Sequence, residues 1–312
     1  MRILLTGASG FIGKSLSEQL IGHNVLMTSR SRIAQNKHHY IKKTISGDED
    51  FSECLNSIDV VIHTAARAHK MNDCSKNPLA DYMETNCFGT LNLARQAANH
   101  GVRRFIFLSS IKVNGEQSQP GKPFRYDDPR RAKDPYGKSK AEAEIGLLKI
   151  AANTQLEVTI IRPPLVYGPG VKANFAAFLN LASKNLPLPL AAVNNKRSFV
   201  ALDNLTSLII RCIDHPKAAN QIFLVSDDSD VSTPMLFRIM VKAFGKKPLL
   251  LNCNPILLKA IARLFGKGSE IDRLCEDLVL DIEYTKNLLD WAPVISLEEG
   301  VLICVSGLVN NN

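Results

Sequence analysis

The feature that most constrains the fold of this 312-residue chain is a glycine-rich turn at residues 6–13, Thr-Gly-Ala-Ser-Gly-Phe-Ile-Gly. It follows a short apolar run at 2–6 and opens a segment, 11–21, with helical spacing of its apolar residues. Glycines at this spacing between a strand and a helix permit a tight turn, let the backbone approach a pyrophosphate and let the helix pack closely on the strand. We therefore predict a dinucleotide site that includes Gly7, Ser9, Gly10, Phe11, Ile12 and Gly13.

Strand-like and helix-like segments alternate along the first half of the chain. Short apolar runs predict strands at 2–6, 24–28, 58–63, 104–108 and 157–161, with a weaker strand at 41–45. The spacing of apolar residues predicts helices at 11–21, 78–100 and 135–153. Strands that alternate with helices of this length form βαβ units around a buried, mostly parallel sheet. The pattern therefore predicts an α/β fold with a doubly wound parallel sheet.

The pattern loosens after Pro163, because prolines at 163, 164, 169, 187 and 189 interrupt it. Beyond them we expect a helix at 203–214, one further buried strand at 221–225 and amphipathic helices from Pro234 onward. We therefore expect a dinucleotide-binding domain over residues 1–164, with returns to its sheet near 200–226. A smaller C-terminal α/β lobe over 165–312 would mainly bind the substrate.

Composition narrows the class of protein further. Hydrophobic residues make up 45 % of the chain and charged residues 22 %, which is typical of a globular protein with a real core. There is no apolar run long enough for a membrane-spanning helix, no secretory signal pattern, and no CxxC pair among the seven cysteines. We expect a cytoplasmic protein with no membrane insertion, and we find no zinc-ligand spacing.

The net charge of +8 favours polyanionic partners. The densest basic cluster, Arg125, Arg130, Arg131 and Lys133, falls in a predicted loop and is interpreted as solvated. Because the remaining Lys and Arg are scattered, we expect small phosphorylated ligands such as dinucleotides and nucleotide-sugars, and no nucleic acid.

The end of the second predicted strand bears on which dinucleotide binds. A free ribose 2′-hydroxyl is usually met by an acidic residue there, whereas a 2′-phosphate is met by Arg. Residues 29–32 read Ser-Arg-Ser-Arg, and the next acid is Asp48. Arg30 is placed to pair with a phosphate, so NADP(H) is favoured. The alternative is that Arg30 stacks on the adenine, which leaves NAD(H) possible.

A tyrosine and a lysine lie one helical turn apart at the start of the predicted helix 135–153, in Tyr136-Gly-Lys-Ser-Lys140. Side chains at this spacing share one helix face. A tyrosine hydroxyl with an ordinary pKa of about 10 is a poor base at neutral pH, but a nearby ammonium and a positive nicotinamide ring favour the phenolate. Ser109 and Ser110 follow the strand at 104–108, where a hydroxyl can orient the reacting oxygen.

These motifs together resemble the extended short-chain dehydrogenase/reductases of the NAD(P)-dependent nucleotide-sugar epimerase/dehydratase family. The resemblance covers essentially the whole chain, from the glycine turn to the closing TKNLLDW at 285–291 and SLEEG at 296–300. Between them lie DVVIHTAA at 59–66, NCFGTLNL at 86–93, FLSSIKVNG at 107–115, YGKSK at 136–140 and RPPLVYGPG at 162–170. The resemblance implies a Rossmann-type fold, a UDP-sugar substrate and a homodimer.

The resemblance also assigns roles to individual residues. Tyr136 would be the acid–base, Lys140 would lower its pKa and hold the nicotinamide ribose, and Ser110 would be the catalytic hydroxyl. Asn86 would pack under the active site or serve only inside its helix. Along the cofactor the resemblance places Ala65, Ala66 and Pro163. On the substrate side it places Ser109, Lys112, Asn174, Arg197 and Arg273, although Lys112 is equally consistent with a surface lysine.

Three functions are compatible with these residues. We favour reduction of a UDP-4-keto-6-deoxy-N-acetylhexosamine by NADPH, because Arg30 suits NADPH. The segments IKVNG, RAHKMND (67–73) and RPPLVYGPGVKANF resemble a narrower branch of the family. That branch contains UDP-glucose 4-epimerase-like proteins and also reductases that make sugars for bacterial surface polysaccharides such as O-antigen. The alternative is a UDP-glucose or UDP-N-acetylglucosamine 4-epimerase with tightly bound NAD⁺. A remote third is a non-catalytic dinucleotide sensor or RNA-binding scaffold, which would be expected to lack Tyr136 or Lys140.

Overall fold

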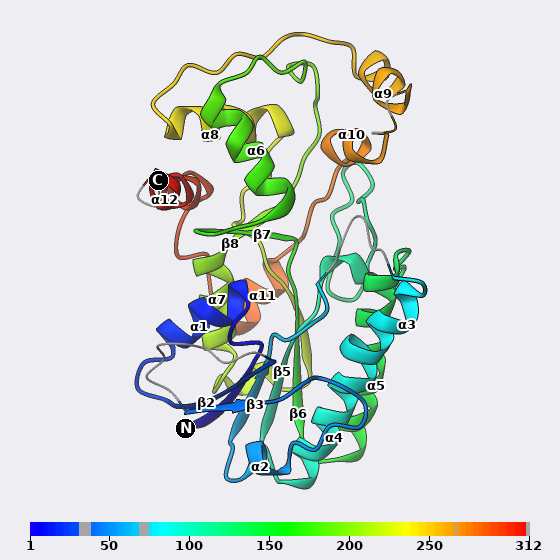
Figure 1. Cartoon of the computed structure of the whole chain (residues 1–312), viewed down its shortest axis with the longest axis vertical. Helices are drawn as coiled ribbons and strands as arrows, with labels where there is room; N and C mark the ends of the chain where they lie inside the picture. Colours follow the sequence, from blue (N-terminus) through cyan, green and yellow to red (C-terminus); the bar gives the residue numbers. More distant parts are fainter. Residues whose placement is uncertain (31–38, 69–74, 265, 267, 310–312) are drawn as a thin grey trace.

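The computed structural model describes residues 1–30, 39–68, 75–264, 266 and 268–309. Among the motifs above, residues 31–32 and 69–73 lie outside this description. The centre of the molecule is a seven-stranded parallel sheet with the order β3-β2-β1-β4-β5-β6-β9 (Figure 1). Its strands are β1 (Arg2–Thr6), β2 (Asn24–Ser29), β3 (His39–Lys42), β4 (Val60–His63), β5 (Arg104–Leu108), β6 (Glu157–Arg162) and β9 (Gln221–Leu224).

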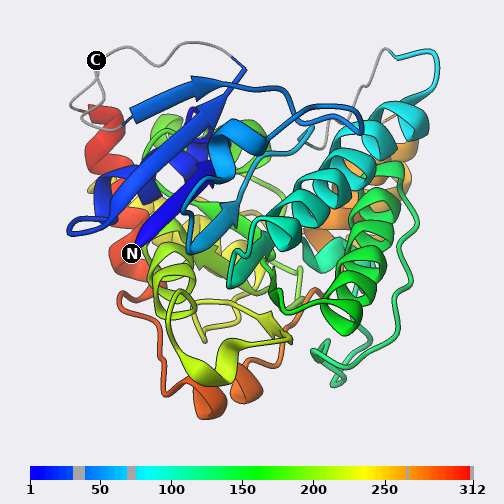
Figure 2. The same cartoon turned by 90° about the horizontal axis from the view of Figure 1, so that it is seen from below.

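The sheet is apolar on both faces, as a parallel sheet covered by helices on either side requires. In β1, for example, Ile3, Leu4 and Leu5 have no exposed surface. Helices cover both faces, and Figure 2 shows two of them, α4 and α5, side by side along one flank of the sheet. One face carries α1 (Phe11–Gln19), α7 (Leu202–Arg211) and α11 (Glu283–Leu289), and the other carries α2 (Ser52–Leu55), α4 (Thr90–Asn99) and α5 (Pro135–Asn153).

The predicted long helix at 78–100 is present but is not uniform. It begins as α3 (Pro78–Tyr82), with the Asn77 side chain accepting a hydrogen bond from the Ala80 amide, and continues as α4. Between the two, η1 (Met83–Gly89) has π-helical hydrogen bonding. A π-helical turn within an α-helix is often found at a functional site, because it turns side chains away from the regular helix face.

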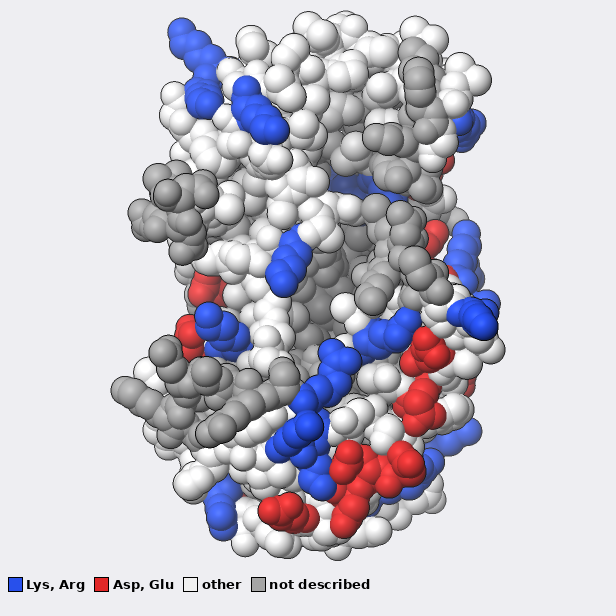
Figure 3. Space-filling view, in the orientation of Figure 1, with Lys and Arg blue, Asp and Glu red and all other residues white. Residues whose placement is uncertain are grey.

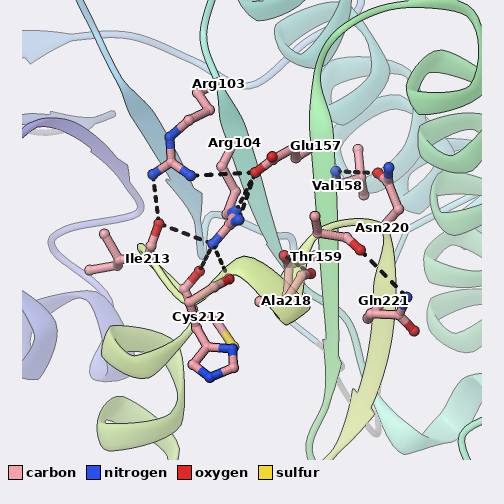
Figure 4. Close-up of polar contacts among 12 residues, drawn as sticks. Arg103, Arg104, Glu157, Val158, Thr159, Cys212, Ile213, Ala218, Asn220 and Gln221 are labelled. Carbon is pink, nitrogen blue, oxygen red and sulfur yellow. Dashed lines mark hydrogen bonds and ion pairs between the residues drawn. The ribbon is translucent and has the colours of Figure 1, made fainter. Parts of the chain in front are cut away.

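Arg104 connects the base of the sheet to the later part of the chain (Figure 4). Its side chain is 1 % exposed, and its guanidinium pairs with Glu157 at 2.6 Å. It also donates hydrogen bonds to the backbone oxygens of Cys212 and His215, which follow α7. The Asn220 side chain accepts a hydrogen bond from the Val158 amide, which helps to fix β9 beside β6. These contacts hold the chain where it returns to the first sheet.

A smaller lobe lies above the sheet in the view of Figure 1. A parallel pair of short strands, β7 (Leu165–Tyr167) and β8 (Phe199–Ala201), lies at its base. Its core is a separate cluster that includes Tyr167, Phe175 and Phe237. Its helices are α6 (Ala173–Lys184), α8 (Thr233–Ala243), α9 (Pro255–Leu264), α10 (Gly268–Cys275) and α12 (Leu297–Val309). Among the described helices, none is both long and apolar enough to cross a lipid bilayer.

The predicted fold class is confirmed: the sheet is parallel, Rossmann-like and flanked by helices. The weaker strand expected at 41–45 is shifted, because β3 occupies His39–Lys42 beside β2. The helix α6 and the pair β7–β8 were not predicted. The prolines around them disrupt local periodicity, and their positions depend on packing against the rest of the lobe.

Candidate active site

In the glycine turn, the backbone lies so close to neighbouring backbone atoms that side chains would not fit at Gly7 and Gly13. Gly7 has a φ of +72°, and a Cβ atom there would lie 2.6 Å from the backbone nitrogen of Ala65. A Cβ atom on Gly13 would lie 2.2 Å from the Gly7 carbonyl oxygen. Gly10 precedes α1 and provides no side-chain cap for the first amides of that helix. An uncapped helix N-terminus beside a glycine turn attracts phosphate groups.

A pocket opens in front of this turn. Its lining includes several predicted cofactor residues and basic side chains from the segments that follow β2, β3 and β4, but no acidic residue among the described ones. The Ser29 hydroxyl donates to Ser9 at 3.0 Å, and Arg30 is exposed at the rim. The lining residues are Gly7, Ser9, Gly10, Thr28, Ser29, Arg30, Lys43, Thr44, Ile45, Thr64, Ala65, Ala66, Arg67 and Thr85.

This pocket fits the phosphates and the adenosine half of a dinucleotide. The glycine turn and the start of α1 offer amides, and Arg30 offers positive charge, while the Lys43 ammonium pairs with Glu49 at 3.1 Å. Phe11 lines a groove that continues from Ser9 and Gly10 along α1, and Ile12 packs against the core on that face of the sheet. Pro163 is buried further along, and its carbonyl oxygen accepts a hydrogen bond from the Ile111 amide at 2.9 Å.

Tyr136 and Ser110 are brought together by the start of α5. Asp134 is the N-cap of this helix and accepts a hydrogen bond from the Gly137 amide at 2.7 Å. Gly137 allows the helix to lie against the segment after β5, because a Cβ atom there would be 3.0 Å from the Lys112 carbonyl oxygen. The Tyr136 hydroxyl consequently forms a hydrogen bond with the Ser110 side chain. The two predicted reacting hydroxyls are therefore adjacent.

The pKa of Tyr136 is raised to about 12, chiefly because the phenol is shielded from water and further because the Asp134 carboxylate is nearby. The sequence predicted the opposite direction, with Lys140 lowering this pKa. In the structure the Lys140 ammonium donates instead to the Leu108 carbonyl oxygen at 2.8 Å and lies 4.4 Å from the centre of the Phe107 ring. Burial therefore keeps the Tyr136 phenol protonated at neutral pH, and the predicted lowering of its pKa by Lys140 stays a prediction.

Lys140 itself is 2 % exposed. Burial lowers its pKa to about 7, although the Glu144 carboxylate one turn further along α5 opposes this effect. A lysine with a pKa near neutrality can change its charge within the working range of an enzyme. Such a shift is typical of functional sites.

Ser109 does not face the same way as Ser110. It is 3 % exposed, and its hydroxyl donates to the buried Glu144 carboxylate at 2.6 Å. Arg162 and Arg130 donate to the same carboxylate. In this structure the Ser109 hydroxyl therefore belongs to the support beneath α5, and its predicted contact with the substrate stays a prediction.

A chain of hydrogen bonds links the glycine turn to α5 through His63 and Asn86. The His63 ring bonds Thr6 at 2.7 Å and Thr90 at 2.9 Å, and burial lowers its pKa to about 3, so the ring is neutral. The Thr90 hydroxyl donates to the Asn86 carbonyl oxygen, and the Asn86 amide donates to Ser139. Asn86 therefore contacts α5 directly through Ser139, three residues from Tyr136.

The predicted substrate residues are in different surroundings. Lys112 forms an ion pair with Asp134, next to Tyr136. Asn174 is exposed in the first turn of α6. Arg197 is half-buried, and its guanidinium donates to the backbone oxygens of Arg273 and Glu276 at 2.7 and 3.0 Å. Arg197 and Arg273 are thus brought together at the end of α10, but through the Arg273 backbone.

Sequence reasoning missed two residues that organise this site, Asp134 and Glu144. Asp134 caps α5 and pairs with Lys112, and Glu144 is a fully buried acid that receives two arginines and a serine. The first had a readable signal, because Asp followed by Pro marks a helix N-terminus. The sequence contains no signal for the role of Glu144, since an acid in a helix usually faces solvent.

The fold and the site define a Rossmann-type protein with a pocket at its glycine turn and, on α5 and after β5, adjacent serine and tyrosine side chains and a buried lysine. Residues 3–226 match the family described as "NAD dependent epimerase/dehydratase family". The chain belongs to this family and is an enzyme of the NAD-dependent epimerase/dehydratase type. A preference for NADP(H), predicted from Arg30, is not supported by these findings.

Individual relatives are similar over almost the whole chain. A UDP-glucose 4-epimerase of Vibrio cholerae is 47 % identical, covering 96 % of this chain and 92 % of that protein. A putative UDP-glucose 4-epimerase of Methanocaldococcus jannaschii is 26 % identical over 99 % of both chains. The solved structure of a Thermotoga maritima UDP-glucose 4-epimerase with UDP-glucose superimposes with a TM-score of 0.80 at 25 % identity, covering 100 % of this chain and 99 % of that one.

Proposed function

We propose that this protein is a UDP-hexose 4-epimerase that uses a tightly held NAD⁺ to interconvert UDP-glucose or UDP-N-acetylglucosamine with its C4 epimer. The observation that carries this proposal is the 47 % identity, over 96 % of the chain, to a UDP-glucose 4-epimerase. The adjacent Ser110 and Tyr136 hydroxyls are consistent with it. The proposal reverses the preference for a reductase that the sequence alone suggested.

In this proposal the residues of α5 and β5 handle the proton at the 4-hydroxyl of the sugar. A bound nicotinamide dinucleotide supplies the acceptor and then the donor of the C4 hydride. Tyr136 takes the proton from the 4-hydroxyl and returns it, while Ser110 holds the reacting oxygen in line with the phenol. Tyr136 needs a positive charge nearby to lose its proton at neutral pH. Lys140, one turn along the same helix, supplies that charge once its ammonium leaves the Leu108 oxygen.

The division of labour between the two parts of the molecule is also a proposal. Residues 1–164, with the return near 200–226, would hold the dinucleotide, and residues 165–312 would mainly bind the nucleotide-sugar. Within them, Lys112, Asn174, Arg197 and Arg273 are proposed to contact the sugar or its diphosphate. For Arg197 this requires its side chain to exchange a backbone oxygen for a phosphate oxygen.

One observation favours the alternative, reduction of a UDP-4-keto-6-deoxy-N-acetylhexosamine by NADPH. Arg30 lies at the rim of the pocket, directly after β2, and no acidic side chain lines the described part of that pocket. An arginine without an acid at this place suits a 2′-phosphate. A reductase would draw on NADPH, whereas an epimerase recycles its cofactor.

Two assays on the same purified protein separate these functions. The first mixes it with UDP-glucose or UDP-N-acetylglucosamine and follows the C4 epimer by chromatography. The second mixes it with a UDP-4-keto-6-deoxy-N-acetylhexosamine and NADPH or NADH, and follows the absorbance of the reduced nicotinamide. We expect epimer formation without net consumption of nicotinamide. Stoichiometric loss of NADPH, with no epimer formed, would overturn the proposal and support the reductase.

The cofactor released on denaturation gives an independent check. We expect NAD⁺ rather than NADP⁺ in the supernatant of heat-treated protein. An Arg30→Ala variant should retain its bound NAD⁺ if Arg30 only stacks on the adenine. NADP⁺ in the supernatant, lost in that variant, would contradict the assignment of NAD⁺.

A further inference from the structure

The net positive charge of this chain arises from two stretches of the upper lobe that contain no acidic residue. Residues 231–268 contain seven Lys or Arg and no Asp or Glu, and residues 165–202 contain four Lys or Arg and no acid. These two stretches more than account for the net charge of +8. Figure 3 shows the consequence on one face, where the upper part carries Lys and Arg but little Asp or Glu.

The same lobe exposes large apolar side chains at the end of the molecule farthest from the sheet. Leu249 and Leu251 lie on the segment between α8 and α9, and Ile256 and Leu264 on α9 are 78 % and 86 % exposed. We call this surface the apical patch, and it is formed by Leu186, Leu249, Leu251, Ile256, Leu257 and Leu264.

Two parts of the apical patch that are distant in sequence are held together by backbone hydrogen bonds. The Leu188 amide donates to the Leu249 oxygen at 3.2 Å, and the Leu251 amide donates to the Leu188 oxygen at 2.8 Å. Leu186 therefore lies near the segment that carries Leu249 and Leu251. Figure 1 shows this segment running over the top of the lobe to α9.

Lysines accompany these leucines. Lys184, Lys246 and Lys247 are exposed, and Lys246 donates to the Ser183 oxygen, next to Lys184. The cations of α9 are arranged differently, because Lys259 and Arg263 pair with Asp272 on α10. Among the described residues, the acids of this region thus face α9 and α10, while the three lysines border the leucines.

A surface of apolar side chains bordered by lysines is complementary to a particular kind of partner. A bilayer with anionic lipids accepts leucine and isoleucine below its headgroups and attracts lysine to its surface. A nucleic acid would bind the lysines through its phosphates but would not bury exposed leucines. An apolar protein partner would bind the leucines but would not require lysines around them. The combination therefore favours a lipid surface.

We propose that the apical patch binds the surface of an anionic lipid bilayer. Helix α9 and the Leu249–Leu251 segment would lie in the interface, and Lys184, Lys246 and Lys247 would lie over the anionic headgroups. The binding is peripheral, and it is independent of the reaction that the active site performs.

Co-sedimentation of the whole protein with vesicles tests this proposal. One set of vesicles is phosphatidylcholine alone, and the other contains phosphatidylglycerol as well. We expect the bound fraction to increase with phosphatidylglycerol and to fall as salt is added. Absence of binding to the phosphatidylglycerol vesicles would overturn the proposal. Retention on heparin without vesicle binding would also overturn it and would identify a surface for soluble polyanions.

Two matched pairs of substitutions show whether the apical patch is responsible. Lys246→Gln with Lys247→Gln should weaken binding to the anionic vesicles by roughly tenfold or more. Lys149→Gln with Lys217→Gln removes the same charge from exposed sites elsewhere and should have a much smaller effect. An equal loss of vesicle binding from the two double substitutions would show that the apical patch is not the binding site.

A separate double substitution tests the contribution of the exposed leucines to vesicle binding. Leu249→Ser with Leu251→Ser should reduce vesicle binding by roughly tenfold while the unfolding temperature and sugar turnover stay unchanged, since both side chains are about half exposed. Unchanged vesicle binding in this variant would rule out insertion of the apical patch. That outcome would not affect the proposed epimerase activity.

Discussion

Two arginines, one beneath the catalytic helix and one at the base of the upper lobe, are held in different ways. Arg162 is 1 % exposed, and its guanidinium donates to both carboxylate oxygens of Glu144 at 2.6 and 2.9 Å. Arg197 is only half-buried and donates to backbone oxygens of the segment at the end of α10. A bidentate pair of buried charges fixes an orientation, whereas bonds to neutral carbonyls can be exchanged for others.

This comparison indicates that the surroundings of α5 are held more rigidly than the base of the upper lobe. The reacting hydroxyls lie on α5 and directly after β5, which the buried Glu144 and its partners hold together. Within the lobe that we propose for the nucleotide-sugar, Arg197 makes hydrogen bonds to neutral backbone oxygens. The proposed proton transfer therefore lies on a fixed frame, and the proposed recognition of the nucleotide-sugar lies on a more adjustable one.

Tyr136→Phe should cause the largest loss of activity, because it removes the hydroxyl that carries the proton. We expect turnover to fall by about 10²–10⁴-fold with bound cofactor retained, as measured by epimer formation and by cofactor release. Tyr126→Phe is the matched control, since its ring stacks on Tyr284 with centroids 3.7 Å apart and its hydroxyl has no role in the account. Unchanged turnover in Tyr136→Phe would remove the basis of the mechanism.

Glu144→Ala should cause the largest loss of stability. It leaves Arg162 buried without its carboxylate, which typically costs about 3–5 kcal/mol of unfolding free energy. Denaturant unfolding measures this loss. Glu142→Ala, on the exposed side of the same helix, should change the value by less than about 0.5 kcal/mol. Similar small effects from the two variants would show that the buried pair does not hold the catalytic helix.

Lys140→Met should stabilise the protein without cofactor by about 1–3 kcal/mol near pH 7, at the expense of activity. Burial lowers the pKa of Lys140 to about 7 from its ordinary 10.5. Between these values the unfolded chain binds more protons, so the stability of the wild type rises with pH. The advantage of the variant should therefore shrink as unfolding is measured from pH 7 towards pH 10. An advantage independent of pH would contradict the lowered pKa.

Arg197→Gln should have the smallest and most local effect on stability. It removes two hydrogen bonds to backbone oxygens, for which we expect about 1–2 kcal/mol. Hydrogen exchange should accelerate in α10 but not in β5 or β6. A loss of unfolding free energy as large as that of Glu144→Ala would show that the two regions are held equally firmly.

Most of the sheet could be predicted from sequence, because its strands are short apolar runs separated by recognisable helices. Strand β1 and helix α5 have the predicted bounds. The upper lobe could not be predicted in the same way. Its β7–β8 pair joins residues about 34 apart with only three residues in each strand, so no local pattern identifies it.

The candidate site was only partly predictable for a similar reason. Tyr136 and Lys140 share a helix face by spacing alone, and Ser110 follows a strand end. The orientation of Ser109 was not predictable, because it depends on Glu144, which is 35 residues away in sequence. The direction of the Tyr136 pKa shift also depends on burial and on Asp134, which only the packed structure reveals.

The central claim is that the protein removes a hydride from C4 of a UDP-hexose and returns it to the same carbon. UDP-glucose and UDP-N-acetylglucosamine labelled with deuterium at C4 test it most directly. We predict that the C4 epimer forms with the deuterium still at C4 and with none in an added pool of nicotinamide dinucleotide. Loss of deuterium to that pool, or absence of the epimer from both sugars, would contradict the claim.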